Sequence, residues 1–216
     1  NSDGNVNPGE NIELQVELKN FGTQTANSVT ATISSDNDFI TITDAEETYG
    51  NIAANSSLFS SDDFDFSVDA STLGSSEIKL DMVIEDDLGN TWNDIIYLIV
   101  EGATLDEQEY TILDNGNGFL DPGEITEMSV TLQNLGSLSA SAVYGELTSN
   151  NEQVVVTDNT GYFGDIAANG QATNSTDTFG LAAGTQLVVG TQVAMDLHLY
   201  NADGYDDTVQ FIMSVG

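Results

Sequence analysis

The sequence predicts an all-β protein that consists of two tandem β-sandwiches. Three observations predict this fold class. Apolar and polar residues alternate, turn residues separate the alternating runs, and the second half of the chain repeats the first. An alternation with a period of two is typical of strands that bury one face and expose the other. No stretch of the chain has the apolar spacing of a helix.

The alternating runs define the strands of the first half. In the first run, Ile12, Leu14, Val16 and Leu18 alternate with polar residues. The acidic turn at 86–90 separates the last two runs. About seven strands in roughly 100 residues are typical of an immunoglobulin-like β-sandwich. We expect these strands at residues 12–18, 29–33, 40–42, 49–52, 64–68, 80–84 and 92–100.

An internal repeat sets the domain organisation. A shift of 114 residues places Asn-Phe-Gly at 20–22 on Asn-Leu-Gly at 134–136, and 49–55 on 163–169. Further on, the shift becomes 115 and pairs Gly89 with Gly204. This self-similarity predicts tandem repeats. We expect repeat 1 at residues 1–102, a short acidic linker at 103–113 and repeat 2 at residues 114–216.

Both halves also share a motif. The pattern Val-x-Leu-x-Asn-x-Gly occurs at 16–22 and 130–136, and Ala-x-x-Val follows it each time. The motif resembles the adhesion-related immunoglobulin-like repeats of bacterial and archaeal secreted and surface proteins. Asp-Pro-Gly-Glu at 121–124 is similar to the calcium-type lead-in loop of many such repeats. The resemblance implies a non-catalytic extracellular module, often repeated in tandem or appended to a secreted enzyme.

The chain is strongly acidic, because 36 Asp and Glu residues face only two Lys residues, for a formal net charge of -34. Such an imbalance destabilises a compact chain through self-repulsion unless cations relieve it. Nucleic acid and anionic membranes need basic surfaces, so we expect neither as a partner. We expect no membrane insertion, because no stretch is apolar over 18 residues. The composition also fits a purely solvated acidic surface.

The strongest candidate site is the loop at 114–124, which combines oxygen ligands with glycines. Ca²⁺ takes six to eight oxygens from carboxylates, amides and carbonyls. The loop departs from an EF-hand, because Gly116 falls at position 3 and Ile125 at position 12. A solvated turn has a similar composition, so the loop alone leaves both interpretations open. The candidate ligands are Asp114, Asn115, Asn117, Asp121 and Glu124, with Asp3, Asn5, Asn7 and Glu10 in the first repeat.

Strand parity extends this candidate site to other loops. If successive strands reverse direction, the loops after strands 2, 4 and 6 lie at the same end of the domain as the opening loop. We therefore expect a calcium-binding pole in each repeat, and one site at the joint between the repeats. The added residues are Asp36, Asp38, Asp62, Asp63, Asp86 and Asp87 in repeat 1, and Asn150, Glu152, Asp177, Asp203, Asp206 and Asp207 in repeat 2.

Other candidates are weaker. His198, the only histidine, falls on the solvent-facing side of its strand, and no nucleophile or phosphate-binding motif is present. We therefore expect no enzyme activity. Trp92, Tyr97, Tyr200 and Tyr205 are candidates for a sugar-stacking surface, although strands also favour aromatic residues for packing.

These features favour a secreted or cell-surface, calcium-binding tandem-repeat module. We expect it to act as a rigid structural spacer, an adhesin segment or a subunit of an extracellular assembly. The expected partners are calcium ions, together with other copies of the chain or components of the cell surface or matrix. The alternative is an accessory domain of a secreted hydrolase that binds polysaccharide or peptide.

Overall fold

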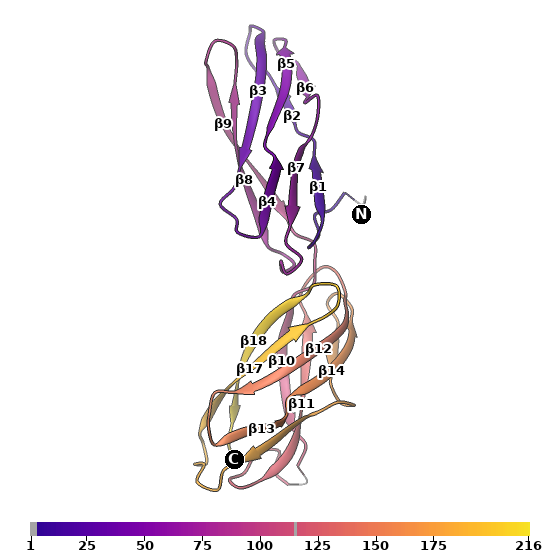
Figure 1. Cartoon of the computed structure of the whole chain (residues 1–216), viewed down its shortest axis with the longest axis vertical. Helices are drawn as coiled ribbons and strands as arrows, with labels where there is room; N and C mark the ends of the chain where they lie inside the picture. Colours follow the sequence, from indigo (N-terminus) through magenta and orange to yellow (C-terminus); the bar gives the residue numbers. More distant parts are fainter. Residues whose placement is uncertain (1–3, 115) are drawn as a thin grey trace. The chain divides into compact units, whose positions relative to one another are not determined.

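The computed structural model describes residues 4–114 and 116–216. Within these residues all regular structure is β-strand, and the strands pair in antiparallel sheets (Figure 1). The all-β class that the alternation predicts is therefore confirmed. Across the described ranges there is no helix of the length and apolarity that a membrane span requires.

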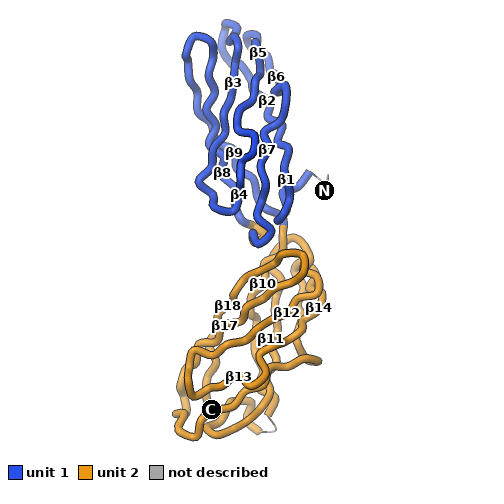
Figure 2. Tube along the Cα trace, viewed as in Figure 1, with its two compact units in different colours: residues 1–72, 76–101 blue, residues 73–75, 102–216 orange. Residues whose placement is uncertain are grey.

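The chain forms two compact units (Figure 2). Unit 1 comprises residues 1–72 and 76–101, and unit 2 comprises residues 73–75 and 102–216. The short segment 73–75 belongs to unit 2 because Gly74 N donates a hydrogen bond to Ala103 O at 2.9 Å. In addition, Thr104 Oγ1 donates to Gly74 O at 2.8 Å.

Unit 1 has a sandwich-like arrangement of short sheets. The strand orders are β1-β7-β4, β2-β6 and β5-β3-β8-β9. The strands are β1 (Asn11–Leu14), β2 (Glu17–Lys19), β3 (Ala26–Ser34), β4 (Ile40–Asp44), β5 (Glu46–Ile52), β6 (Ser57–Phe59), β7 (Phe64–Val68), β8 (Glu77–Glu85) and β9 (Thr91–Ile99). Alternate residues form the core, as in β7, where Phe64, Phe66 and Val68 are buried.

Unit 2 has longer strands and a larger core. The strand orders are β10-β11-β16-β13, with β15 also pairing β11, and β14-β12-β17-β18. The strands are β10 (Leu105–Ile112), β11 (Ile125–Asn134), β12 (Ala140–Ser149), β13 (Val154–Asp158), β14 (Thr160–Ile166), β15 (Gln171–Thr173), β16 (Phe179–Ala183), β17 (Gln192–Tyr200) and β18 (Asp206–Ser214). Phe179, Leu132 and Met195 lie fully buried among the inward-facing residues.

Two features differ from the sequence-based expectation. Residues 103–113, expected as a linker, contain strand β10, which pairs antiparallel with β11. The alternation there is masked by acids, but Leu105 and Ile112 are buried at its two ends. Furthermore, β4 and β5 do not reverse direction. Only Ala45 separates them, and the chain passes from one sheet to the other while it continues along the unit.

The Asn-x-Gly motif has a clear structural role. The Asn134 side chain donates to Leu138 O (2.8 Å) and Ile166 O (3.1 Å), and its Oδ1 accepts from Gly136 N (2.9 Å). Asn20 makes the matching bonds to Gln24 O, Ile52 O and Gly22 N in unit 1. Each asparagine thus ties the turn that follows its strand to the opposite sheet.

Candidate functional site

The predicted calcium loop connects β10 to β11 at one end of unit 2. Leu120 lies buried in it and forms a parallel bridge with Val215. Gly216 N also donates to Leu120 O at 3.2 Å. The loop is therefore anchored to the end of β18, and the polar residues on either side of Leu120 stay at the surface.

In the first half of the loop, hydrogen bonds link Asp114, Asn117 and Asp121. The Asp114 carboxylate accepts hydrogen bonds from Asn117 N and Gly118 N, both at 3.0 Å. Asn117 Nδ2 lies 3.4 Å from each carboxylate oxygen of Asp121. Asp114, Asn117 and Asp121 thus form a chain of polar contacts. Asn115 lies outside the described residues.

The second half of the loop is a tight turn that Asp-Pro-Gly-Glu specifies. Glu124 N donates to Asp121 O at 3.0 Å, and Gly123 has a φ of 85°. Proline and glycine are the residues that a type II turn favours at its two central positions. The Glu124 carboxylate accepts from Asp121 N at 2.9 Å, so it faces its own turn.

The matching turn in unit 1 repeats this arrangement. Glu10 N donates to Asn7 O (3.3 Å), Asn7 N donates to Glu10 Oε2 (3.2 Å), and Gly9 has a φ of 75°. Asn5 lies in the bend before Val6, and Asp3 lies outside the described residues. Asn7 Nδ2 also donates to Glu101 O at 3.0 Å, which ties the opening turn to the end of unit 1.

The donor chemistry of the unit 2 loop suits calcium better than a soft metal. In the described part of the chain, no three His, Cys, Asp or Glu side chains are placed to hold a metal ion together. The loop instead offers two carboxylates, those of Asp114 and Asp121, while the amide oxygen of Asn117 accepts from Phe119 N at 2.9 Å and its Nδ2 faces Asp121. Calcium accepts amide, carbonyl and water oxygens beside carboxylates, so this set fits part of its coordination shell.

The acids at 203–207 do not join this loop. Leu105 N, at the start of β10, donates to Tyr205 Oη at 2.9 Å. The 114–124 loop follows the other end of β10, so Asp203, Asp206 and Asp207 lie at the opposite end of unit 2. There Asp203 accepts from Ser141 Oγ, and Asp206 Oδ1 lies 3.0 Å from His198 Nε2. The expectation of one shared pole is wrong for these residues.

In unit 1, too, some of the loop acids lie at the end of the unit opposite to the expected one. Asp36 and Asp38 lie in the β3–β4 loop, at the same end as the opening turn, because Asp69 N donates to Phe39 O and Gly9 N to Val68 O. Asp86 and Asp87 lie at the other end, where Asp87 N donates to Asn27 O. Asp62 and Asp63 lie between β6 and β7.

The physical reason is the direct continuation from β4 into β5. Counting them as two reversing strands adds one reversal that the chain does not make. Every later loop is then assigned to the wrong end. In unit 2, β10 also carries the chain along the whole unit before the loop begins, so the loop lies away from residues 102–104. The expected site at the joint between the repeats stays a prediction.

Asp86 shows how such acids serve turns. Its Oδ1 accepts from Leu88 N and Asn90 N, and its Oδ2 accepts from Asn90 Nδ2. The hydrogen bond from the Asn90 side chain lowers the pKa of this carboxyl below its usual value. These bonds close the β8–β9 hairpin, in which Gly89 has a φ of 77°.

Aromatic residues line the outer face of the four-stranded β14-β12-β17-β18 sheet of unit 2. The rings of Tyr144 and Tyr162 are 4.8 Å apart, those of Tyr144 and Tyr200 5.9 Å, and those of Tyr200 and His198 5.3 Å. Tyr205, by contrast, packs partly buried against the core. The sequence analysis identified Tyr200 but not the two tyrosines beside it, because cross-strand register is needed to see the row.

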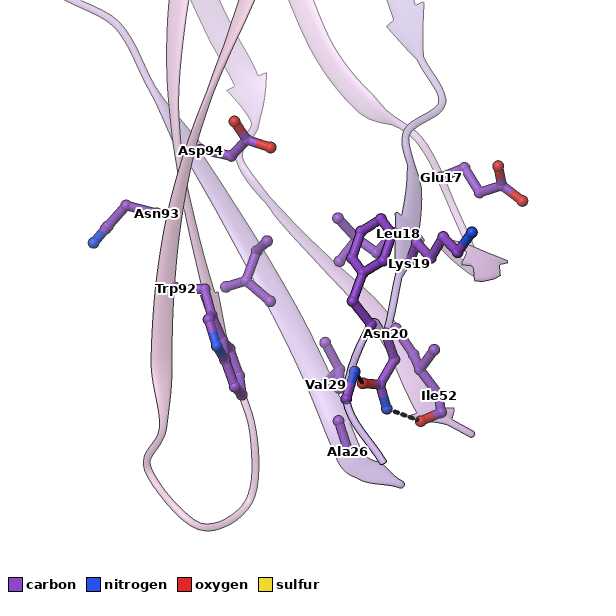
Figure 3. Close-up of a pocket in the computed structure, with 13 residues that line it drawn as sticks. Glu17, Leu18, Lys19, Asn20, Ala26, Val29, Ile52, Trp92, Asn93 and Asp94 are labelled. Atoms are coloured by element: carbon purple, nitrogen blue, oxygen red, sulfur yellow. Dashed lines mark hydrogen bonds between the residues drawn. The ribbon is translucent and has the colours of Figure 1, made fainter. Parts of the chain in front are cut away.

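Unit 1 contains a groove that the sequence analysis did not predict. It has a volume of ≈ 540 Å³ and lies between β2 and β9. Figure 3 shows Trp92 and Asp94 on one wall and Leu18, Lys19 and Asn20 on the other. Trp92 and Tyr97 lie five residues apart on one strand and so point to opposite faces. The single Trp, 48% exposed, was the only sequence signal for this groove.

Comparisons with known proteins show only remote structural likeness. No protein-family model and no curated protein matches the chain. Among solved structures, it is similar to red sea bream transglutaminase, with 10% identity, a TM-score of 0.46, and coverage of 98% of this chain but only 30% of that one. The YadV chaperone has 14% identity and a TM-score of 0.28 over 93% and 92% of the two chains. The Pseudomonas aeruginosa CupB2 chaperone has 10% and 0.26 over 99% of each.

Proposed function

We propose that the chain is a non-catalytic, calcium-binding module of two tandem sandwich repeats, and that it serves as a structural spacer or adhesive segment in an extracellular setting. The observation that carries the proposal is the chain of hydrogen bonds that links the Asp114 carboxylate, Asn117 and the Asp121 carboxylate in the loop between β10 and β11. The formal charge of -34 supports it, because bound cations relieve self-repulsion.

The loop geometry suggests what calcium does in this module. Asp114 follows β10 closely, and Asp121 precedes β11. An ion held by both carboxylates joins the two ends of the hairpin, and Leu120 ties that hairpin to Val215. Calcium therefore rigidifies one end of unit 2. A folded loop presents this site and an unfolded chain does not, so binding stabilises the fold.

Calorimetry on the full chain tests the proposal. Calcium at a hundredfold excess over its Kd adds about 2.7 kcal/mol of stability, so the melting temperature of unit 2 rises on going from chelator to calcium. Magnesium at equal ionic strength gives a smaller rise, because it retains its waters and demands octahedral geometry. Asp121→Asn lowers the calcium-induced rise. The matched control Asp177→Asn, an exposed loop acid elsewhere in unit 2, leaves it unchanged.

Equal shifts with calcium and magnesium in all variants would mean that the ions act only by screening, and the proposal would fail. The ligand-binding accessory domain would then be the better candidate, with the row of Tyr144, Tyr162 and Tyr200 as its surface.

A further inference from the structure

We propose that Asn117 is a site of spontaneous covalent modification, at which the folded loop converts its own asparagine into aspartate or isoaspartate. The chemistry is the attack of a main-chain nitrogen on the side chain of the asparagine before it. Glycine after the asparagine favours this attack, because it has no Cβ to hinder ring closure. Asn-Gly occurs at 115–116, 117–118 and 169–170. Asn115 lies outside the described residues, so the structure compares the other two pairs.

The attacking nitrogen of the 117–118 pair is held on a carboxylate. Gly118 N donates a hydrogen bond to Asp114 Oδ1 at 3.0 Å. A carboxylate that accepts this N–H is placed to take its proton as a general base, which makes the nitrogen a better nucleophile. Asp114 closely follows β10, whose last residue is buried, and Leu120 is bridged to Val215. Both ends of the segment are therefore anchored.

The side-chain amide under attack is also held in place. Asn117 Oδ1 accepts from Phe119 N at 2.9 Å. This oxygen gains negative charge as the nitrogen of Gly118 bonds to Cγ, and a donor already aimed at it stabilises that charge, as in an oxyanion hole. Asn117 Nδ2, the leaving group, lies 3.4 Å from each carboxylate oxygen of Asp121, which fixes the orientation of the amide.

The reaction balances with water as the only reagent. A bond forms between Gly118 N and Asn117 Cγ, and the proton on Gly118 N moves to the Asp114 carboxylate. The Cγ–Nδ2 bond then breaks, and Nδ2 takes that proton back through water and leaves as ammonia, so that a five-membered succinimide remains. Water opens the ring at Cγ to give aspartate, or at the main-chain carbonyl to give isoaspartate. Asn117 and Gly118 are both exposed, so water reaches the ring.

The second Asn-Gly pair, at 169–170, is held differently. Gly170 N donates to Ala167 O at 2.8 Å, and a main-chain carbonyl is a much weaker base than a carboxylate. Gly170 O accepts from Asn134 N at 2.9 Å, which fixes the glycine on its other side. The two pairs share a dipeptide sequence but differ in the group that holds the attacking nitrogen. A difference between their rates of conversion therefore reports the structure.

The conversion changes the charge of the loop, because either product carries a carboxylate where Asn117 carries an amide. The consequence for calcium rests on the proposed function: three carboxylates in the loop hold the ion more tightly than two, since ligand charge tunes calcium affinity. Asn117→Asp should therefore give a larger calcium-induced rise in the melting temperature of unit 2 than the parent chain. No rise in either chain would refute the proposed function alone, because the conversion itself is measured in chelator.

Peptide mapping by mass spectrometry measures the conversion in the full chain, incubated at neutral pH with chelator. Fragment spectra distinguish Asn115, Asn117 and Asn169, and a sample digested at once gives the background. We expect Asn117 to convert at least about tenfold faster than Asn169, since a positioned general base contributes at least that factor. In guanidinium chloride the folded geometry is lost, so the conversion of Asn117 should slow and the two rates should become similar.

Two variants separate the action of the Asp114 carboxylate from that of general charge. Asp114→Asn keeps a side-chain oxygen that can accept from Gly118 N but removes the base, so the conversion of Asn117 should slow by about tenfold. The matched control Glu109→Gln, which removes an exposed acid of β10, should leave the rate unchanged. Equal rates at Asn117 and Asn169 in the folded chain, no slowing of Asn117 in guanidinium chloride, or no effect of Asp114→Asn would overturn the proposal.

Discussion

At the residue scale, Glu47 shows how burial acts on one carboxylate in this acidic chain. Its side chain in β5 is only 4% exposed. Burial raises the pKa of its carboxyl, and the negative charges of Asp44 and Asp62 raise it further. Hydrogen bonds from the backbone of Asp62 and Thr48 oppose this shift without cancelling it. At neutral pH the folded chain therefore holds this charge at a cost in free energy.

The sign of the pKa shift predicts the effect of a substitution. A group whose pKa is raised on folding contributes stability below its unfolded pKa, and that contribution is lost as the pH rises through the folded pKa. Glu47→Gln should therefore raise the melting temperature of unit 1 at pH 7. At about pH 4, near the unfolded pKa, the gain should shrink.

The neighbouring Glu46 provides the control, because Glu46→Gln removes the same charge from an exposed position on the same strand. Glu46→Gln lessens the general repulsion between acidic residues but removes no buried charge. Its rise in melting temperature at pH 7 should therefore be smaller than that of Glu47→Gln. Calorimetric melts of both variants across this pH range make the comparison. Equal gains at every pH would show that burial of Glu47 carries no penalty.

At the scale of single elements, the Asn-x-Gly turn stabilises the two units unequally. Asn134 is fully buried, and its Oδ1 also accepts from Thr104 N at 3.2 Å. Asn20 makes its bonds at a partly exposed site. Since each buried polar group left unpaired costs about 1–3 kcal/mol, Asn134→Ala should destabilise unit 2 by about 3 kcal/mol and Asn20→Ala should destabilise unit 1 by about 1 kcal/mol.

Urea denaturation resolves these effects, with Trp92 emission for unit 1 and far-ultraviolet circular dichroism for the whole chain. Gln133→Ala, one residue before Asn134 and partly exposed, should change stability by less than about 0.5 kcal/mol. A small effect of Asn134→Ala would mean that water replaces the lost bonds.

The elements also show what the sequence could and could not predict. Alternation located most strands, because burial of one face imposes it directly, as in β7 and β8. It could not show that β4 runs on into β5, since Asp44-Ala45-Glu46 resembles a turn. The acids of β10 concealed a strand for the same reason: Asp106 and Glu109 point to solvent, and only Leu105, Tyr110 and Ile112 carry the pattern.

The candidate site also has one part that the sequence could predict and another part that it could not. The contacts within the 114–124 loop join residues three or four positions apart, so local sequence is enough to single out this loop, and its binding of calcium stays a prediction. The grouping of distant loops depended on the number of times the strands reverse direction. Because the continuation of β4 into β5 was not predicted, the later loops were assigned to the wrong end of each unit. Cross-strand features, such as the tyrosine row and the groove beside Lys19, had no local signal.

At the scale of the whole molecule, the two units should differ in stability. Unit 1 buries about half as many apolar side chains as unit 2, and its groove leaves Leu18, Ile96 and Leu98 partly exposed. Buried apolar area is the main favourable term in folding, at roughly 25 cal/mol per Å². Unit 1 should therefore unfold at a lower urea concentration than unit 2, so that Trp92 emission changes in the first of two transitions seen by circular dichroism.

Calcium should make this difference adjustable. It acts on the loop at 114–124 of unit 2 and binds only the folded form of that loop, so it should move the second transition to a higher urea concentration and leave the first in place. A single coincident transition for both probes would show that the units unfold together, and the unequal cores would then have no separate effect on stability.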